Sequence, residues 1–403
     1  MSSMKQGPHL TFQPFRSKLE IIKISWRYNG VALQLHDYCR IKMLSSISEA
    51  SSDVRLSNMV LFTSCSNEVV LMSFVTLDDV LFSYVYRKQP ACSHVIYQDD
   101  PPKEVFLYLM HCAYQSELWT LAETDLALWK KAFGKRFRML VAYDRDSLEP
   151  IGCICSATYL HRDRNAKTTV IGLYYVREEF RGKGIGNELF RRIIANKEHH
   201  NLYLNGISNM VRKYQILYNF ALATPWRIVW YQIDTENLSV DELPRQNNKT
   251  IAVIDVAAAN ISHALEYDSR VQNDLDRTSY IRSFTTQPCA DSKLAIFGGV
   301  VVGIGVARLL YNNELFIGPL YADNFEVARV LIYNLLGGKH HGRYRSVQIQ
   351  FPSVNEEAYR LMKEISHGKI SDDEFMQGLS TKFRIETDPM KIYSTTEYDI
   401  SVF

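Results

Sequence analysis

Residues 176–187 read VREEFRGKGIGN and are the most informative part of the sequence. It follows a run rich in β-branched and aromatic residues, TTVIGLYYV at 168–176, which is typical of a strand. After it, apolar residues recur at helical spacing on one stripe, at Leu189, Phe190, Ile193 and Ile194. The sequence therefore predicts a strand, a glycine-rich loop and an amphipathic helix in succession.

The loop has the composition of a phosphate cradle. Gly182, Gly184 and Gly186 allow a tight turn and a close approach of ligand to backbone. A helix that begins near Gly184 directs its unpaired N–H groups and the positive end of its dipole at the loop. Arg181 and Lys183 add positive charge, so the junction predicts a pyrophosphate site. The alternative is a glycine-rich surface turn without a ligand.

The glycine spacing separates several phosphate-binding families. A Walker loop needs G-x-x-x-x-G-K-[ST], which the sequence lacks, and in a dinucleotide fingerprint the third glycine would come one residue later. The string R-G-x-G-I-G, with Val176 five residues before Arg181, resembles motif A of the GCN5-related N-acetyltransferases (GNAT). That pattern is V-x-P-E-[YF]-R-G-x-G-I-G, and the one departure is Glu178 in place of proline.

The resemblance implies acetyl-CoA as co-substrate, bound where two strands of a mixed, mostly antiparallel sheet splay apart. Here those strands are expected at 168–176 and 202–204. Backbone groups of Tyr174, Tyr175 and Val176 would hold the pantetheine arm and polarise the thioester carbonyl. The pyrophosphate would be bound by the amides of Arg181, Gly182, Lys183, Gly184, Ile185, Gly186 and Asn187.

The family chemistry is direct attack of an amine on the thioester. The resemblance makes Tyr214, on the helix after the second of those strands, the candidate general acid for the leaving thiolate. A packing role is the alternative for this tyrosine. Glu178 is a weak candidate for the general base. The alternatives are that Glu178 is only a solvated glutamate of the loop and that a chain of water molecules takes the proton.

Around this motif, residues 92–240 follow the order β-α-α-β-β-β-α-β-α-β and form the expected N-acetyltransferase domain. Residues 241–248 are polar and are predicted to be a linker. Residues 249–403 repeat a similar order. The fold class is thus α+β, with two tandem GNAT-like domains of mixed sheet flanked by helices. They follow an N-terminal extension at 1–91, which is either an extra subdomain or weakly ordered.

The second domain resembles the family through other segments than the glycine-rich loop. Residues 314–323, ELFIGPLYAD, resemble a segment of the YitH-type acetyltransferase-like domain, and Asn355 opens an N-x-x-A helix start. Asp323 stands where the first domain has its basic, glycine-rich loop, and with Glu326 it is predicted to form a capping box. An aspartate there would repel a pyrophosphate, so we expect a degenerate partner domain.

Composition narrows the classes of function. The 403 residues carry a net charge of +2, which argues against a nucleic-acid partner, and no apolar run reaches the length of a membrane span. The 7 cysteines show no framework or zinc-ligand spacing, so no metal is expected. Without a secretory signal, we expect reduced thiols and an intracellular, cytoplasmic location. The oligomeric state is not indicated.

The function predicted is an acetyl-CoA-dependent N-acetyltransferase acting on an unidentified primary amine of a small molecule or peptide. The alternative is a non-catalytic acyl-CoA-binding or scaffold protein that keeps the fold. Tyr214→Phe separates the two, because it lowers turnover only in an enzyme.

Overall fold

The computed structural model describes residues 94–240, 243, 250–367 and 375–403, together with four strands nearer the N-terminus. The chain divides into two compact units, Met1–Pro90 and Ala91–Phe403. In the first unit, β1 (Ile22–Tyr28) pairs antiparallel with β2 (Val31–Asp37), and β3 (Leu61–Thr63) with β4 (Val69–Leu71). The rest of the predicted extension, and the predicted linker apart from Leu243, lie outside the described residues.

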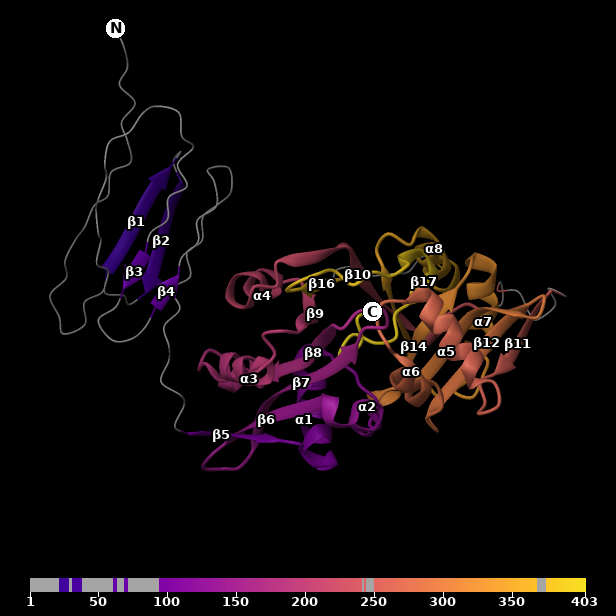
Figure 1. Ribbon diagram of the computed structural model, residues 1–403, viewed down its shortest axis with the longest axis horizontal. Helices are drawn as coiled ribbons and strands as arrows, with labels where there is room; N and C mark the ends of the chain where they lie inside the picture. The colour runs from indigo at the N-terminus through magenta and orange to yellow at the C-terminus, as the bar shows by residue number, and fades with distance from the viewer. Residues whose placement is uncertain are drawn as a thin grey trace, which may run out of the picture. The chain divides into compact units, whose positions relative to one another are not determined.

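The second unit is built on one sheet of 13 strands, flanked by helices (Figure 1). Its first half consists of β5 (Val95–Asp99), α1 (Lys103–Glu117), α2 (Asp125–Phe133), β6 (Phe137–Asp144), β7 (Pro150–Leu160), β8 (Lys167–Val176), α3 (Ile185–Ile194), β9 (Asn201–Ile207), α4 (Val211–Tyr218) and β10 (Leu222–Asp234). The order of helices and strands predicted for this half is confirmed.

The second half repeats that order with one more strand, β17, at its end. It consists of β11 (Ile251–Asp255), α5 (Ile261–Val271), α6 (Thr278–Thr285), β12 (Ala290–Phe297), β13 (Val300–Leu309), β14 (Glu314–Ala322), α7 (Phe325–Leu336), β15 (Ser346–Pro352), α8 (Glu356–Ile365), β16 (Phe375–Ser380) and β17 (Ile392–Ser394).

The two halves exchange strands, which the sequence did not predict. β10 of the first half pairs antiparallel with β15 of the second, and β16 of the second half lies between β10 and β9. The order across the sheet is therefore β11-β12-β13-β14-β15-β10-β16-β9-β8-β7-β6-β5. Two separate sheets were expected, but each half covers an edge of the other and a single sheet results.

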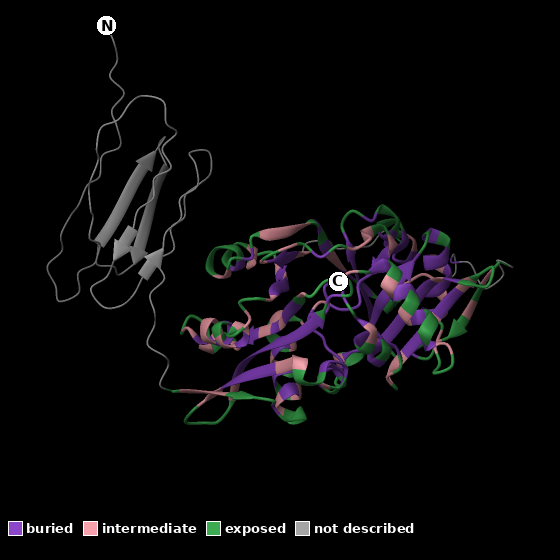
Figure 2. Cartoon of the chain, viewed as in Figure 1, coloured by how far each residue is buried: buried purple, intermediate pink, exposed green. Residues whose placement is uncertain are grey.

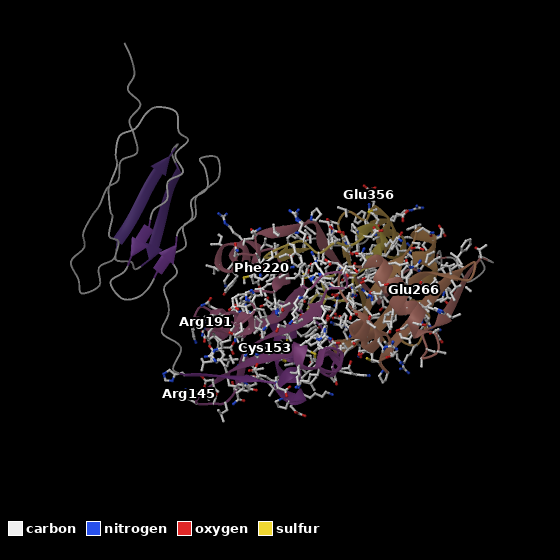
Figure 3. All side chains as sticks on the ribbon, viewed as in Figure 1. Arg145, Cys153, Arg191, Phe220, Glu266 and Glu356 are labelled. Carbon is white, nitrogen blue, oxygen red and sulfur yellow. The ribbon has the colours of Figure 1, made fainter. Side chains whose placement is uncertain are left out.

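The helices cover the sheet on both faces. α1, α2, α5 and α6 contribute to one buried cluster that spans both halves, whereas α3 and α4 pack on the opposite face of the first half. Figure 2 shows buried residues concentrated along the strands and on the sides of helices that face them. Side chains fill the space on both faces, with Cys153 of β7 in the interior of the first half (Figure 3). None of the helices in the described residues is long and apolar enough to cross a membrane.

Candidate functional site

The site is organised by a split in the sheet between β8 and β9. The two strands pair in parallel from Thr168↔Asn201 to Val170↔Tyr203, and β9 then pairs with β16 instead. Beyond that point the edge of β8 faces the split. Opposite β7 the register shifts, and Leu173 has a φ of 44°, so a bulge re-aims the backbone of β8 at this position. The predicted splay of these strands is present.

The glycine-rich loop leads from the end of β8 into α3. Gly182 and Gly184 have φ values of 74° and 82°, in the left-handed region that glycine adopts without strain. Gly184 is the N-cap of α3 and has no side chain with which to cap it. No described heavy atom lies within 4 Å of a Cβ placed on Gly182, and residues 181–183 are exposed. This open helix N-terminus fits a pyrophosphate.

The third glycine has a different role. A Cβ on Gly186 would lie 2.5 Å from the hydroxyl oxygen of Tyr174, which packs beneath the first turn of α3. Gly186 therefore serves the close packing of Tyr174 against the helix. Asn187, also in this turn, accepts a hydrogen bond from the Tyr218 hydroxyl at 2.8 Å and so ties α3 to α4.

The basic side chains of the loop fold back onto the domain. The Arg181 Nε donates to the carbonyl of Val176 at 2.8 Å, and its guanidinium forms an ion pair with Glu117 at the end of α1. The Lys183 ammonium lies 5.0 Å from the centre of the Phe180 ring. The ion pair with Glu117, which the sequence did not predict, holds Arg181 at the mouth of the split.

Tyr214 lies on the α3–α4 face of the split. Its ring is buried, 6.4 Å from that of Tyr174 on β8, and it packs against Gly206 on β9. Burial raises the pKa of Tyr214 above its ordinary value, and the neighbouring Tyr218 adds to the rise. A raised pKa keeps the phenol protonated, which suits a proton donor and equally suits a packed tyrosine.

The other candidates from the sequence do not come together at the split. Glu178 is exposed on the short 3-10 turn Glu178–Phe180. Cys153 and Cys155 are both buried on β7, and burial raises the pKa of both thiols, which makes them poor nucleophiles. Among the described residues, no group of three His, Cys, Asp or Glu side chains is arranged to hold a metal ion.

A segment that the sequence did not place at the site occupies the base of the split. Residues 397–403 enter between β8 and β9, and Figure 1 shows the C-terminal end lying between the two halves. From β9, the Tyr203 hydroxyl donates to the carbonyl of Val402 at 2.6 Å, and the Asn205 amide donates to the carbonyls of Tyr398 and Ser401, each at 3.2 Å. On the other side, the N–H of Leu173 donates to Asp399 Oδ1 at 3.2 Å.

Gly172 makes this entry possible. A Cβ at Gly172 would overlap the carbonyl of Asp399, so only glycine lets the segment lie against β8. An isolated glycine within a strand pattern indicates a bulge or a close backbone approach, and Gly172 within 168–176 was that signal. This glycine indicated where another backbone segment would approach β8, but not which segment of the chain it would be.

The second half has an equivalent split, and the chain itself fills it. β14 and β15 pair in parallel from Glu314↔Ser346 to Phe316↔Gln348, after which β17 pairs with β14. Next to β17, the N–H of Thr395 donates to the carbonyl of Gln350 on β15 at 2.6 Å. Backbone thus bridges both sides of this split, where a pantetheine arm would have to lie.

The start of α7 is also closed. Its N-cap is Asn324, whose Oδ1 accepts from the N–H of Val327 at 3.1 Å. The predicted capping role of Asp323 is wrong: its carboxylate accepts from the Tyr267 hydroxyl and pairs with Lys391, each at 3.1 Å. The N-x-x-A start of α8 is confirmed, because Asn355 Oδ1 accepts from the N–H of Ala358 at 3.0 Å.

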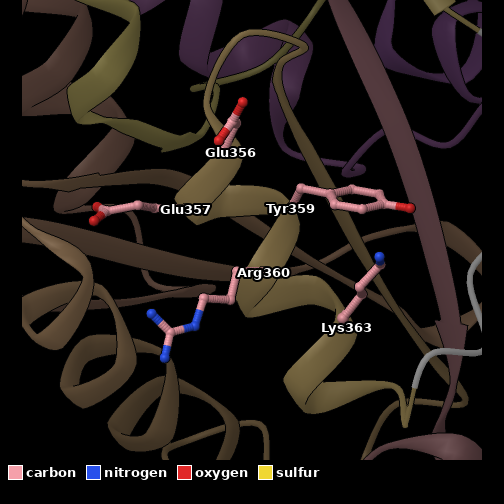
Figure 4. A pocket seen from close by; sticks show the side chains of 5 residues that line it. All are labelled: Glu356, Glu357, Tyr359, Arg360 and Lys363. Atoms are coloured by element: carbon pink, nitrogen blue, oxygen red, sulfur yellow. The ribbon is translucent and has the colours of Figure 1, made fainter.

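A surface hollow lies beside α8, lined by Glu356, Glu357, Tyr359, Arg360 and Lys363 (Figure 4). Two of its charged groups are engaged by neighbours: Tyr393 donates to Glu357, and the Arg360 guanidinium lies 4.2 Å from the centre of the Phe325 ring. The helix beside the hollow, α8, is capped by the Asn355 side chain, so the hollow lacks the open helix N-terminus that distinguishes the first half.

Two sequence models match the chain. That of the acetyltransferase (GNAT) family matches residues 104–209, and that of an acetyltransferase (GNAT) domain matches residues 264–393. The chain therefore belongs to the GNAT superfamily and carries two of its domains in tandem. No curated protein matches it in sequence.

Solved structures share the tandem fold. A candidate acetyltransferase from Pyrococcus horikoshii is 20% identical, with a TM-score of 0.56 over 78% of this chain and 99% of its own. A tandem GNAT protein from the clavulanic acid biosynthesis pathway is 14% identical, with a TM-score of 0.54 over 71% and 98%. The N-myristoyltransferase of Saccharomyces cerevisiae, solved with myristoyl-CoA, is 13% identical, with a TM-score of 0.51 over 76% and 90%. At these identities the likeness concerns the fold.

Proposed function

We propose that the protein is an acetyl-CoA-dependent N-acetyltransferase whose active site is the split between β8 and β9. The observation that carries the proposal is the open N-terminus of α3, reached by a loop with two left-handed glycines at the end of the splayed strand. The second domain lacks this arrangement, since backbone bridges its split and Asn324 caps its helix. We therefore assign one acyl-CoA site to the pair of domains.

Each part of the site has a distinct task. The N–H groups from Arg181 to Asn187 would bind the pyrophosphate, and the edge of β8 from Tyr174 to Val176 would hold the pantetheine arm. The N–H of Leu173 is engaged by Asp399, so the backbone groups of Tyr174 to Val176, which follow it along β8, would polarise the thioester carbonyl. Tyr214 would protonate the departing thiolate.

The acceptor in this proposal is a primary amine of a small molecule or a peptide, acetylated in the cytoplasm by direct attack. The amine nitrogen bonds to the acyl carbon while the carbon–sulfur bond breaks, so no covalent enzyme intermediate is needed. Glu178 stays the weak candidate base that the sequence suggested. The buried thiols of Cys153 and Cys155 favour this direct route over a cysteine-bound intermediate.

Gly184→Asp tests the site directly. The substitution puts a carboxylate at the helix N-terminus and a side chain at a φ of 82°. We expect acetyl-CoA affinity, measured by isothermal titration, to fall at least about tenfold, which corresponds to about 1.4 kcal/mol. Gly299→Asp is the matched control, because Gly299 also has a φ of 82° and its Cβ position is open, but it lies in the β12–β13 hairpin.

The same titrations are followed by a thiol-release assay with spermidine, L-lysine, glucosamine and an alanine-terminated tripeptide. Turnover of any of these that is lost in Gly184→Asp and kept in Gly299→Asp supports the proposal. Equal affinity of the two variants for acetyl-CoA would show that the loop is not part of the binding site. Binding of acetyl-CoA without turnover of any amine would favour the non-catalytic acyl-CoA-binding alternative.

A further inference from the structure

A carboxylate lies at the point of the split where an acyl group would be held. Asp399 is 3% exposed and accepts from Leu173, the residue of the β8 bulge. Its second oxygen, Oδ2, is buried and has no hydrogen-bond partner among the described residues. A buried carboxylate oxygen without a donor is costly, and a catalytic role is one reason for a protein to keep such a group.

The segment that carries Asp399 is fixed from both domains. β9 holds it through Tyr203 and Asn205, and from β7 the Tyr159 hydroxyl donates to the carbonyl of Ile400 at 2.9 Å. The same segment continues from β17, which fills the split of the second domain. The second domain therefore delivers Asp399 into the split of the first.

A second buried carboxylate of the segment, Glu397, accepts its hydrogen bonds from other elements than Asp399 does. Its Oε1 accepts from the Tyr280 hydroxyl at 2.6 Å and from the Trp129 indole at 3.2 Å, between α6 and α2. It thus lies in the packing between the domains, whereas Asp399 contacts the strand that would hold the thioester. The two carboxylates can be separated by mutation.

We propose that Asp399 is the general base of the acetyl transfer and that the second domain completes the active site by supplying it. A thioester held along β8 next to Leu173 would place its acyl group beside Asp399, whose Oδ1 is engaged by the Leu173 N–H, so Oδ2 is the oxygen left to take the proton of the attacking amine. The strand that holds the thioester contributes no carboxylate of its own, which Asp399 compensates.

The proton balance is simple. A neutral amine attacks the acyl carbon, the new carbon–nitrogen bond forms, and the carbon–sulfur bond breaks. The proton leaving the nitrogen goes to Asp399 Oδ2, and the thiolate takes the proton of Tyr214. A proton then returns from Asp399 to Tyr214 through solvent, so the products are the amide and free CoA.

The surroundings set the direction of the pH dependence. Burial raises the pKa of the Asp399 carboxyl well above its ordinary value, and nearby carboxylates add to the rise, against the Leu173 N–H and Arg308. The titratable and charged groups that face it are Glu397 and Tyr398 of the same segment, Asp125 of α2, Arg308 of β13, and Cys153 and Cys155 of β7. A base acts only when deprotonated, so kcat should rise with pH through this raised pKa.

Asp399→Asn in the full chain is the test, because the amide oxygen can still accept from the Leu173 N–H but cannot take a proton. With acetyl-CoA and the best acceptor of the amine panel, we expect kcat to fall about 10²- to 10⁴-fold and its rising pH limb to vanish. The Kd for acetyl-CoA should stay within about threefold. Glu397→Gln is the matched control and should keep kcat within about threefold on the plateau, with the limb moved to lower pH.

This inference rests on the proposed function, and the two fail differently. Wild-type protein that binds acetyl-CoA but acetylates no amine overturns both. Turnover by the wild type with an unchanged kcat and pH limb in Asp399→Asn overturns only the role of Asp399. A loss of kcat in Glu397→Gln alone would indicate that Glu397 is the general base and would contradict the proposal.

Discussion

At the residue scale, small backbone features decide what the site can bind. Two left-handed glycines open the N-terminus of α3, whereas Gly172 and Gly186 admit Asp399 and Tyr174 at close range. The sequence predicted the first pair, because glycine spacing is a local pattern. It could not predict the contacts of the second pair, because Asp399 is more than 200 positions away in the chain and only the fold brings it to β8.

The buried carboxyl of Glu397 makes stability depend on pH. Burial, and then the Asp125 charge, raise its pKa from 4.5 to about 7 in the folded protein. Between these values the folded state binds more protons than the unfolded state, so stability falls as pH rises from about 4.5 to about 7. Glu397→Gln removes this contribution, on the order of 1–3 kcal/mol.

Thermal unfolding of the wild type and Glu397→Gln at pH 5 and pH 7.5 measures the effect. We expect the midpoint of the variant to decline less than that of the wild type over this interval. An equal fall of the unfolding midpoint in the two proteins would show that folding does not raise the pKa of Glu397.

At the element scale, the equivalent helices α3 and α7 of the two domains begin in different ways. α3 begins at a glycine and is left open for a ligand, whereas α7 is closed by Asn324. The sequence led us to expect a degenerate second loop, and it wrongly chose Asp323 as the cap. Adjacent Asp and Asn are both good caps, and the choice between them depends on Tyr267 and Lys391, which engage Asp323 from other elements.

The two asparagine caps should contribute differently to the free energy of unfolding. Asn324→Ala removes one cap and should lower the free energy of unfolding by about 1 kcal/mol. Asn355 caps α8, and its amide also donates to the carbonyls of Pro389, Met390 and Ile392, at 2.9–3.3 Å, which holds the start of β17. Its side chain is buried, so Asn355→Ala should cost about 2–4 kcal/mol. Equal shifts in urea unfolding would contradict the anchoring of β17 by Asn355.

At the scale of the whole molecule, the tandem arrangement is a single structural unit. The order of helices and strands along the chain and the fold class could be predicted, because periodicity and turn residues are local. The exchange of β10 and β16 could not, since a strand pattern indicates which residues are extended but not which partner they pair with. The same limit hid the path of residues 392–403, which fill the split of one domain and then the base of the other.

A crystal structure of the full chain with acetyl-CoA would show where the acyl group is held. We expect the pyrophosphate at the N–H groups of residues 182–187, the thioester beside Leu173 and Asp399, and no ligand between β14 and β15. Acetyl-CoA bound in the split of the second domain, or away from the start of α3, would contradict this expectation.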